Sequence, residues 1–244
     1  MKTPFAGSIK MIDFVVTRHS QVRKTLLICG ILSALIWMGT DILAAVCYKG
    51  YNYPFEPISG LSALDSPMRS FVSSLVNLYV LLKIAFAVGV WMTAVGKRPL
   101  RIMAIMLFTS GFIDLAAFFF PWNPSENLGT LNNIMHGVLA GGLTGLLFLL
   151  TIGFGAKADG SWFRFYSYGT LLVIIVSGGI MAFLNTPGIE GSQPPPWFGL
   201  TERINAYGFM VWMLMLAVIL LCVASSSQAD REIIINPNTP VSRV

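Results

Sequence analysis

The amino-acid sequence predicts an all-α protein, a polytopic transmembrane bundle of six helices with both termini in the cytoplasm. Hydrophobic residues make up 55% of the 244 residues and charged residues only 11%, well below the roughly one-quarter charged content of soluble domains. Six apolar segments of 20 to 25 residues are long enough to cross a bilayer core of about 30 Å as helices. Lysine and arginine lie mostly on one side of these segments, which predicts their orientation.

The six predicted spans are bounded by charged residues, prolines or helix-capping residues. In chain order they are 25–46, 71–95, 100–120, 131–154, 162–184 and 204–223. Together they form a membrane domain over residues 25–223, between a cytoplasmic N-terminal segment, 1–24, and a cytoplasmic C-terminal tail, 224–244. The first 24 residues lack a basic region followed by an apolar run and a cleavage site, so we expect no cleaved signal peptide. Apolar residues at helical spacing in this segment fit an amphipathic helix on the inner membrane surface or a disordered tail.

Charge near the spans predicts their direction across the membrane. Of the 16 Lys and Arg residues, 12 flank the spans on the side of the termini, Lys49, Arg69 and Arg203 lie on the other side, and Lys83 lies within the second span. Short loops rich in Lys and Arg stay in the cytoplasm. The same bias accounts for the pI of about 9.2, so we expect no nucleic-acid partner.

Cysteines, prolines and glycines add three local expectations. Cys29 and Cys47 lie about 27 Å apart along one helix and are too distant for a disulfide bond. Ser66 and Pro67 fit an N-cap and first position before the second span, and the prolines at 194–196 predict an extended segment across the outer opening. Glycines at 137, 141 and 145 form a small-xxx-small pattern, which we expect to pack within the chain rather than at a dimer seam.

Polar residues recur at one depth in the spans. Ionisable groups in a membrane cost about 2.5–3.5 kcal/mol on insertion scales and mark candidate sites. Five spans each place a polar side chain about 8–11 Å below the outer boundary: Asp41, Asn77, Asp114, His136 and Ser177. Asn132, Asn133, Glu202 and Asn205 lie one turn above or beside this layer. We expect a water-accessible polar pocket open to the outer face; the alternative is that these groups tie the helices together.

Lys83 lies about 18 Å from the outer end of its helix, slightly past the midplane, and requires a partner. Tyr79 shares its face, and Asp41 or Asp114 comes within reach if the lysine side chain extends outward. Both a structural ion pair and a coupling site for transport fit this position. We favour the structural pair.

Several chemistries are excluded. The only histidines are His19 and His136, so we expect no three-histidine zinc site and no metal. The motifs of phosphate loops, HExxH metalloproteases and nucleophile elbows are missing, so we expect no cofactor. The chemistry that remains is an acid/base pair of His136 as general base with Asp114 or Asp41. Ser59, Ser62 or Ser177 would then be the nucleophile.

Four segments carry a family resemblance: YPFEPISGLSALDSP at 53–67, GFIDLAAFFFPWNP at 111–124, MHGVLAGG at 135–142 and FGLTERI at 198–204. In this order and spacing the chain resembles, over about residues 26–223, the bacterial and archaeal membrane family catalogued as domain of unknown function 998. The resemblance implies a six-helix protein of the prokaryotic cytoplasmic (inner) membrane, with no established activity. Its motif residues correspond to Ile58, Ser59, Leu61, Phe120, Pro121, His136, Glu202 and Arg203. Gly60 and Asn123 stand where family members often carry acidic residues.

Depth and resemblance together favour an outward-facing intramembrane pocket that binds a lipid headgroup or small polar molecule, with membrane lipids as partners. Its expected ligand-binding residues are Asp41, Ser59, Asn77, Asn133, Glu202 and Arg203, and Arg203 would take an anionic group. One alternative is a membrane-embedded hydrolase or transferase acting on a lipid or lipid-linked substrate, with His136 and Asp114 as catalytic residues. A second alternative is a non-catalytic scaffold or partner subunit.

Overall fold

The computed structural model describes residues 5–184 and 197–235, and within these ranges the chain forms helices joined by loops. The elements are α1 (Phe5–Cys47), the 3₁₀-helix η1 (Ile58–Ser62), α2 (Arg69–Thr93), α3 (Arg98–Ala117), α4 (Leu131–His136), the π-helix η2 (Gly137–Leu143), α5 (Thr144–Gly155), α6 (Ser161–Leu184) and α7 (Phe198–Ile235). Six helical stretches are long and apolar enough to cross a membrane, with α4, η2 and α5 counted as one. The chain is therefore an integral multi-pass membrane protein with the predicted six-helix architecture.

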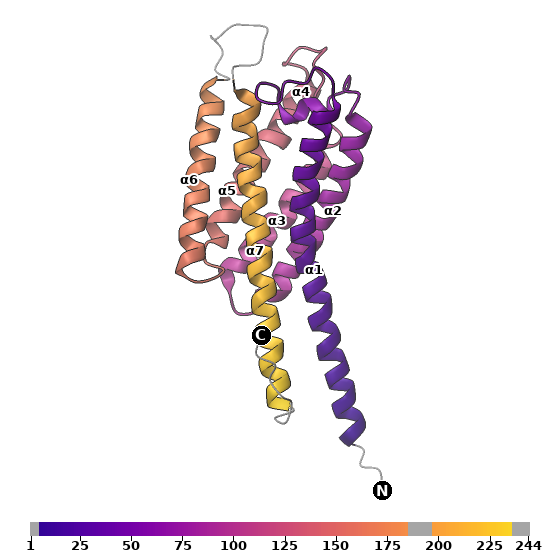
Figure 1. Ribbon diagram of the computed structural model, residues 1–244, viewed down its shortest axis with the longest axis vertical. Coiled ribbons are helices and arrows are strands. Elements are labelled where there is room, and N and C mark those ends of the chain that lie inside the picture. Colours follow the sequence, from indigo (N-terminus) through magenta and orange to yellow (C-terminus); the bar gives the residue numbers. More distant parts are fainter. Residues whose placement is uncertain (1–4, 185–196, 236–244) are drawn as a thin grey trace.

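The helices pack mainly against their neighbours in chain order, and α7 closes the arrangement by packing on α1. Figure 1 shows them side by side along the long axis, with the N-terminal part of α1 and the C-terminal part of α7 extending past the other helices. We call the end from which they extend the proximal end. The opposite end, with loops 48–68 and 118–130, is the distal end. From the charge bias we predict that the proximal end faces the cytoplasm.

Two terminal segments continue as helix beyond the predicted spans. Helix α1 already begins at Phe5, so residues 5–24 extend the first span, and α7 continues to Ile235, into the predicted tail. Near the distal end, the Ser66 hydroxyl accepts a hydrogen bond from the Met68 amide at 3.2 Å, while α2 itself begins at Arg69. Ser66 thus stabilises the turn before the helix. The prolines at 194–196 lie outside the described residues.

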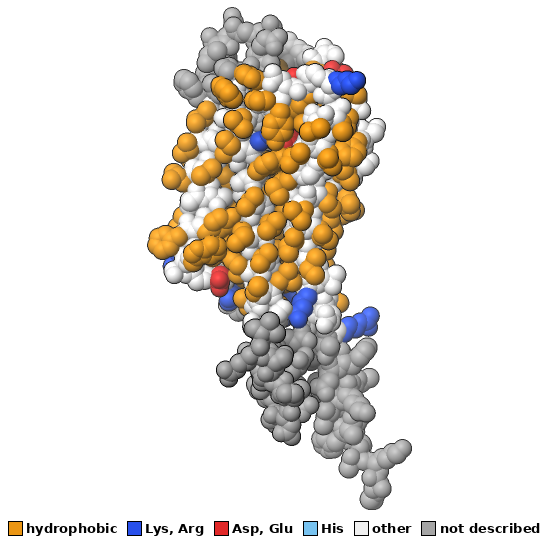
Figure 2. Space-filling view, viewed as in Figure 1, with side chains coloured by type: hydrophobic (Ala, Val, Ile, Leu, Met, Phe, Trp, Pro, Cys, Tyr) orange, Lys and Arg blue, Asp and Glu red, His pale blue; other side chains and the backbone are white. Residues whose placement is uncertain are grey.

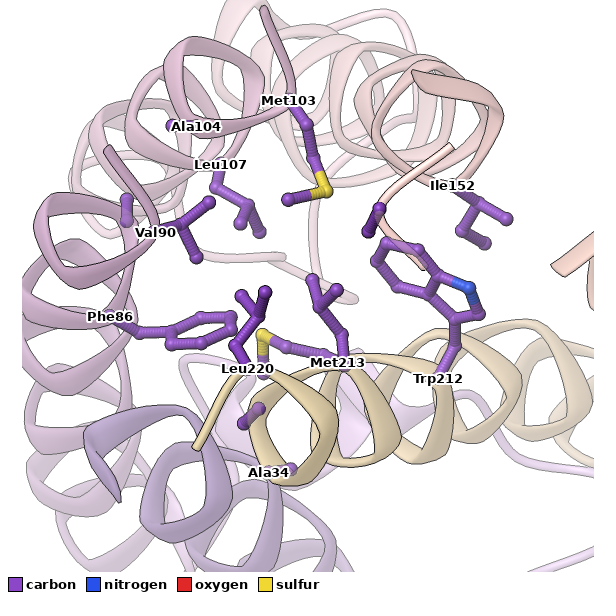
Figure 3. Packing of buried hydrophobic residues seen from close by; sticks show 14 of the residues in the cluster. Ala34, Phe86, Val90, Met103, Ala104, Leu107, Ile152, Trp212, Met213 and Leu220 are labelled. Atoms are coloured by element: carbon purple, nitrogen blue, oxygen red, sulfur yellow. The ribbon is translucent and has the colours of Figure 1, made fainter. Parts of the chain in front are cut away.

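The core lies where α7 meets the other spans. Figure 3 shows Trp212 and Met213 of α7 facing Met103 of α3 and Ile152 of α5, with Phe86 of α2 to one side. The rings of Phe148 and Phe209 stack with centroids 3.7 Å apart, and the Trp212 indole donates to the Ser167 hydroxyl at 2.9 Å. The outward faces of the helices are apolar as well (Figure 2), as lipid contact requires.

Glycines allow close helix contacts, but not those of the repeated pattern. A side chain at Gly89 would meet the backbone of α1 at Leu26, and one at Gly155 would enter the space of Trp212. Side chains built at Gly137, Gly141 and Gly145 would meet nothing within 4 Å. The expectation that these three glycines pack within the chain is therefore wrong, because the close approaches occur on other helix faces.

The fourth span contains an interruption that the sequence did not predict. Between α4 and α5, the chain forms a π-helix over Gly137–Leu143, a rare form that often occurs at functional sites. The hydroxyl of Thr144, directly after it, donates to the carbonyl of Leu139 at 2.9 Å. This bond reaches back five residues and stabilises the wider turn.

Candidate functional site

Two ion pairs of the described residues lie in the distal half of the bundle, and the first joins α1 to α7. Arg203 Nε donates to Asp41 Oδ2 at 3.0 Å, and Arg203 Nη2 donates to Asp41 Oδ1 at 2.9 Å. Both side chains are only 2% exposed. This is the bidentate geometry that a planar guanidinium makes with a carboxylate, and it balances two charges that would otherwise be costly at this depth.

Three tyrosines complete the surroundings of this pair. Tyr207 and Tyr53 donate to Asp41 Oδ2 at 2.6 and 3.2 Å, and the Tyr53 ring lies 3.7 Å from the Arg203 guanidinium. The Tyr51 hydroxyl accepts from Arg203 Nη2 at 2.7 Å and donates to the Pro57 carbonyl at 2.7 Å. Burial raises the pKa of the Tyr51 hydroxyl, so the tyrosine stays neutral.

Arg203 also holds the first distal loop in place. Its Nη1 donates to the carbonyls of Tyr53 at 2.8 Å, Glu56 at 3.1 Å and Gly199 at 3.2 Å. With these bonds, each N–H of the guanidinium has an acceptor, and Asp41 accepts four donors, about the capacity of a carboxylate. The Arg203 guanidinium therefore has no free N–H for a ligand.

The start of α7 and the loop bind each other through backbone groups as well. The amides of Gly199 and Leu200 donate to the carbonyls of Phe55 at 3.3 Å and Pro54 at 2.9 Å. These bonds satisfy two of the N–H groups that a helix start leaves unpaired. A side chain at Gly199 would overlap the Glu56 carbonyl, so only glycine allows this approach.

Glu202 binds the same loop one turn further on. Its Oε2 accepts a hydrogen bond from the Ile58 amide at 2.7 Å, at the start of η1. Trp197 stacks on Phe55 with ring centroids 5.4 Å apart and has a positive φ of 67°, rare for a bulky residue. We call these contacts between residues 51–58 and 197–203 the loop clamp.

A second set of contacts holds the loop between α3 and α4. His136 Nδ1 lies 2.9 Å from the Phe120 carbonyl. The buried Asn133 accepts from the Asn123 amide at 2.9 Å and donates to its carbonyl at 2.9 Å, and Asn132 donates to the Pro121 carbonyl at 2.6 Å. On α4, His136 in the predicted polar layer and Asn132 and Asn133 one turn above it therefore hold this loop in place.

The second ion pair, Lys83–Asp114, joins α2 to α3. The Thr144 hydroxyl, at the end of the π-helix, lies 3.3 Å from Asp114 Oδ1 and shares its one proton between this oxygen and the nearer Leu139 carbonyl. The Lys83 side chain is fully buried, whereas that of Asp114 is 15% exposed. The lysine ammonium lies 5.0 Å from the Tyr79 ring centre. Of the two carboxylates expected to come within reach of Lys83, Asp41 and Asp114, the structure pairs it with Asp114.

This second pair has hydrogen-bonding capacity to spare. Lys83 has three N–H donors, and Asp114 is its one hydrogen-bond acceptor among the described residues. Asp114 accepts from Lys83, lies near the Thr144 hydroxyl and also interacts with the Tyr79 hydroxyl, so little of its capacity of about four acceptor positions remains open. The two cations thus differ: every N–H of Arg203 has a protein acceptor, whereas the three N–H groups of Lys83 have one among the described residues.

An aromatic chain connects the two pairs through the interior. The Tyr79 ring lies 6.4 Å from that of Trp37, and the Trp37 ring lies 5.8 Å from that of Tyr207, edge to face. Tyr207 in turn donates to Asp41. The interior between the pairs is therefore filled by rings contributed by α1, α2 and α7.

The expected acid/base pair of His136 and Asp114 is not formed by direct contact. Each has another partner among the described residues: Phe120 for the histidine and Lys83 with Thr144 for the aspartate. The physical reason is that Lys83, buried and charged, requires Asp114. Phe120 lies just past the end of α3 and offers a carbonyl to the imidazole.

The remaining predicted site residues lie apart from these contacts. The Ser177 hydroxyl donates to Asn205 at 3.0 Å and ties α6 to α7. Asn77 on α2 and Ser59 on η1 are both half-buried. No group of three or more His, Cys, Asp or Glu residues that could hold a metal ion occurs in the part of the chain that the structure describes.

Sequence reasoning missed the tyrosines of the first pair. Tyr207 lies four residues after Arg203 and so shares its helix face, which is a signal that could have identified it. Tyr51 and Tyr53 belong to the loop of the family resemblance, but no spacing rule links a loop residue to Asp41. The contacts also pair the motif segments, because Ile58 binds Glu202 and Phe120 binds His136.

One of three comparisons with known proteins identifies a family for the chain. Residues 31–219 match the family described as "Protein of unknown function (DUF998)". Searches of curated proteins and of solved structures found no match to the chain.

Proposed function

The chain belongs to the DUF998 family of proteins of unknown function, and we propose that this member binds a lipid headgroup or another small polar molecule in the distal half of its bundle. We place the ligand at the Lys83–Asp114 pair, beside the π-helix of the fourth span. Asp41, Glu202 and Arg203 hold the first distal loop over the bundle instead of contacting the ligand.

The observation that carries this proposal is the contrast between the two ion pairs. A buried charge pair that serves stability alone is expected to have its remaining donors and acceptors satisfied by the protein. Arg203 meets this expectation, whereas two N–H groups of Lys83 have no protein acceptor among the described residues. An oxygen of a ligand, such as that of a hydroxyl group, would accept from these N–H groups.

Two further features support the same location. Thr144, which binds Asp114, ends the π-helix, and this irregular backbone re-aims the side chains of the fourth span. The stretch Gly137–Leu143 also carries three glycines, two of which would meet no neighbour if they bore a side chain. Gly137 and Gly141 are exposed, so the outer face of the fourth span carries few side chains along this stretch.

The acid/base alternative is not favoured by any contact. It needs a carboxylate that orients His136, and the two expected carboxylates, Asp114 and Asp41, bind Lys83 and Arg203 instead. The scaffold alternative would require that the Lys83–Asp114 pair binds nothing besides protein and water. The experiment below separates it from ligand binding.

Native mass spectrometry of the full chain, extracted together with its membrane lipids, tests the proposal. We expect bound molecules on the wild type and at least a tenfold loss of them in Thr144→Val, because the hydroxyl that contacts Asp114 and the π-helix carbonyl of Leu139 is removed while the side-chain volume is kept. The matched control is Ser177→Ala, which removes a hydroxyl at similar depth on α6, and it should keep the bound molecules. A wild type without bound molecules, or equal occupancy in both variants, would contradict the proposal.

A further inference from the structure

A group of basic residues marks the proximal end of the bundle between α2 and α3. Lys97, Arg98 and Arg101 are exposed there, around a tight turn in which Gly96 has a φ of +73°. Figure 2 shows Lys and Arg side chains where the apolar face ends toward the termini. Among the described residues, both ion pairs involve other side chains, so none of these three cations has a carboxylate partner.

A tryptophan places this basic group at the membrane boundary. The Arg101 guanidinium lies over the Trp91 ring, 5.7 Å from its centre, and Trp91 is 49% exposed. Tryptophan is enriched at the headgroup level of bilayers. Val95, one turn later, is 78% exposed and adds apolar surface beside the cations. The site thus offers positive charge and an apolar wall together.

Two further features at this end concern N–H donors. Arg23 on α1 has a buried Nε with no hydrogen-bond partner among the described residues. It lies beside the last turn of α2, because the backbones of the two antiparallel helices approach closely at Gly89 and Leu26. In addition, Lys97 gives α3 no side-chain cap, and a helix start without a cap is suited to bind an anion.

We infer that the proximal end around the α2–α3 turn binds the phosphate of an anionic phospholipid, with its acyl chains along Trp91 and Val95. The exposed cations attract the phosphate, and the uncapped start of α3 lies among them. Each cation near an anionic surface contributes about 1 kcal/mol of attraction. This site is separate from the distal ligand site and does not depend on it.

The test measures lipid selectivity on the full chain in neutral detergent. The protein is mixed with equal amounts of phosphatidylglycerol and phosphatidylcholine of the same acyl chains, and native mass spectrometry gives the ratio of the two bound lipids. We expect a clear preference of the wild type for phosphatidylglycerol and at least a tenfold lower ratio in Arg98→Gln/Arg101→Gln. Arg98→Lys/Arg101→Lys, which keeps the charge, should retain most of the preference.

The matched control is Arg164→Gln, which removes an exposed cation at the same end of the bundle, on α6. It should keep the wild-type ratio. An equal loss in Arg164→Gln would show a general surface-charge effect and overturn the proposal, as would an unchanged ratio in the α3 variants. Displacement of phosphatidylglycerol by excess inorganic phosphate would show that the anion alone is recognised and would overturn the lipid as occupant.

Discussion

Removing Arg203 alone is expected to destabilise the protein more than removing both members of its ion pair. Arg203→Met leaves the Asp41 carboxylate buried with two tyrosine hydroxyls as its remaining donors and frees the carbonyls of Tyr53 and Glu56. An uncompensated buried charge costs about 3–5 kcal/mol. For a chain of this size, each kcal/mol lowers the unfolding temperature by about 2–4 °C, so we expect a decrease of roughly 10 °C.

The double variant Asp41→Leu/Arg203→Met separates charge from hydrogen bonding. It contains no unpaired charge, so the free energy of unfolding should fall only by the cost of leaving the loop carbonyls without donors, about 1–3 kcal/mol. Asp41→Leu alone leaves a buried guanidinium and should cost about 3–5 kcal/mol. The assay is thermal unfolding of purified protein in neutral detergent, with Lys49→Met, an exposed change at the same end, as the control. Additive effects, or single variants as stable as the wild type, would refute the reasoning.

Three further predictions rest on other parts of the bundle. Asp114→Asn should cost about 3–5 kcal/mol because it leaves Lys83 buried without a counter-charge, and Lys83→Met/Asp114→Leu should recover most of this loss in the same unfolding assay. Gly199→Ala should destabilise the protein by at least about 2 kcal/mol, since its methyl group would overlap the Glu56 carbonyl. Gly141→Ala should be neutral or stabilise the protein by up to about 1 kcal/mol. Equal effects of the two substitutions would contradict the geometry. In a background with all three cysteines replaced by serine, Asn127→Cys should react with an impermeant thiol reagent added to whole cells and Lys157→Cys should not, and the reverse labelling would invert the predicted orientation.

The six spans could be predicted because each is determined by local sequence. A run of 20 or more apolar residues has one stable form in a bilayer, and charges and prolines mark its ends. The continuations of α1 and α7 beyond the membrane carry no such signal, since their polar sequences fit helix and coil about equally. The π-helix was not predicted either, because its glycine-rich stretch is as apolar as the helices around it.

Part of the candidate site could be predicted from the sequence, because the depth of a residue along its helix can be counted but its neighbours on other helices cannot. Depth along each helix identified Asp41, Asp114 and His136 as members of one layer, because depth follows from counting residues. Which residues meet depends on how the helices rotate and pack, and sequence alone does not give this. Arg203 was placed in the pocket as an anion-binding residue, whereas the structure shows its donors occupied by Asp41 and the first loop.

The most direct test of the distal ligand site is an experimental map of the full chain in lipid nanodiscs, obtained by cryo-electron microscopy. Our proposal predicts non-protein density within hydrogen-bond distance of Lys83 or Asp114, entering beside the π-helix at Gly137–Leu143. Density of this kind should be lost in Thr144→Val and retained in Ser177→Ala. A map in which the Lys83–Asp114 pair contacts only protein and water would contradict the proposed function.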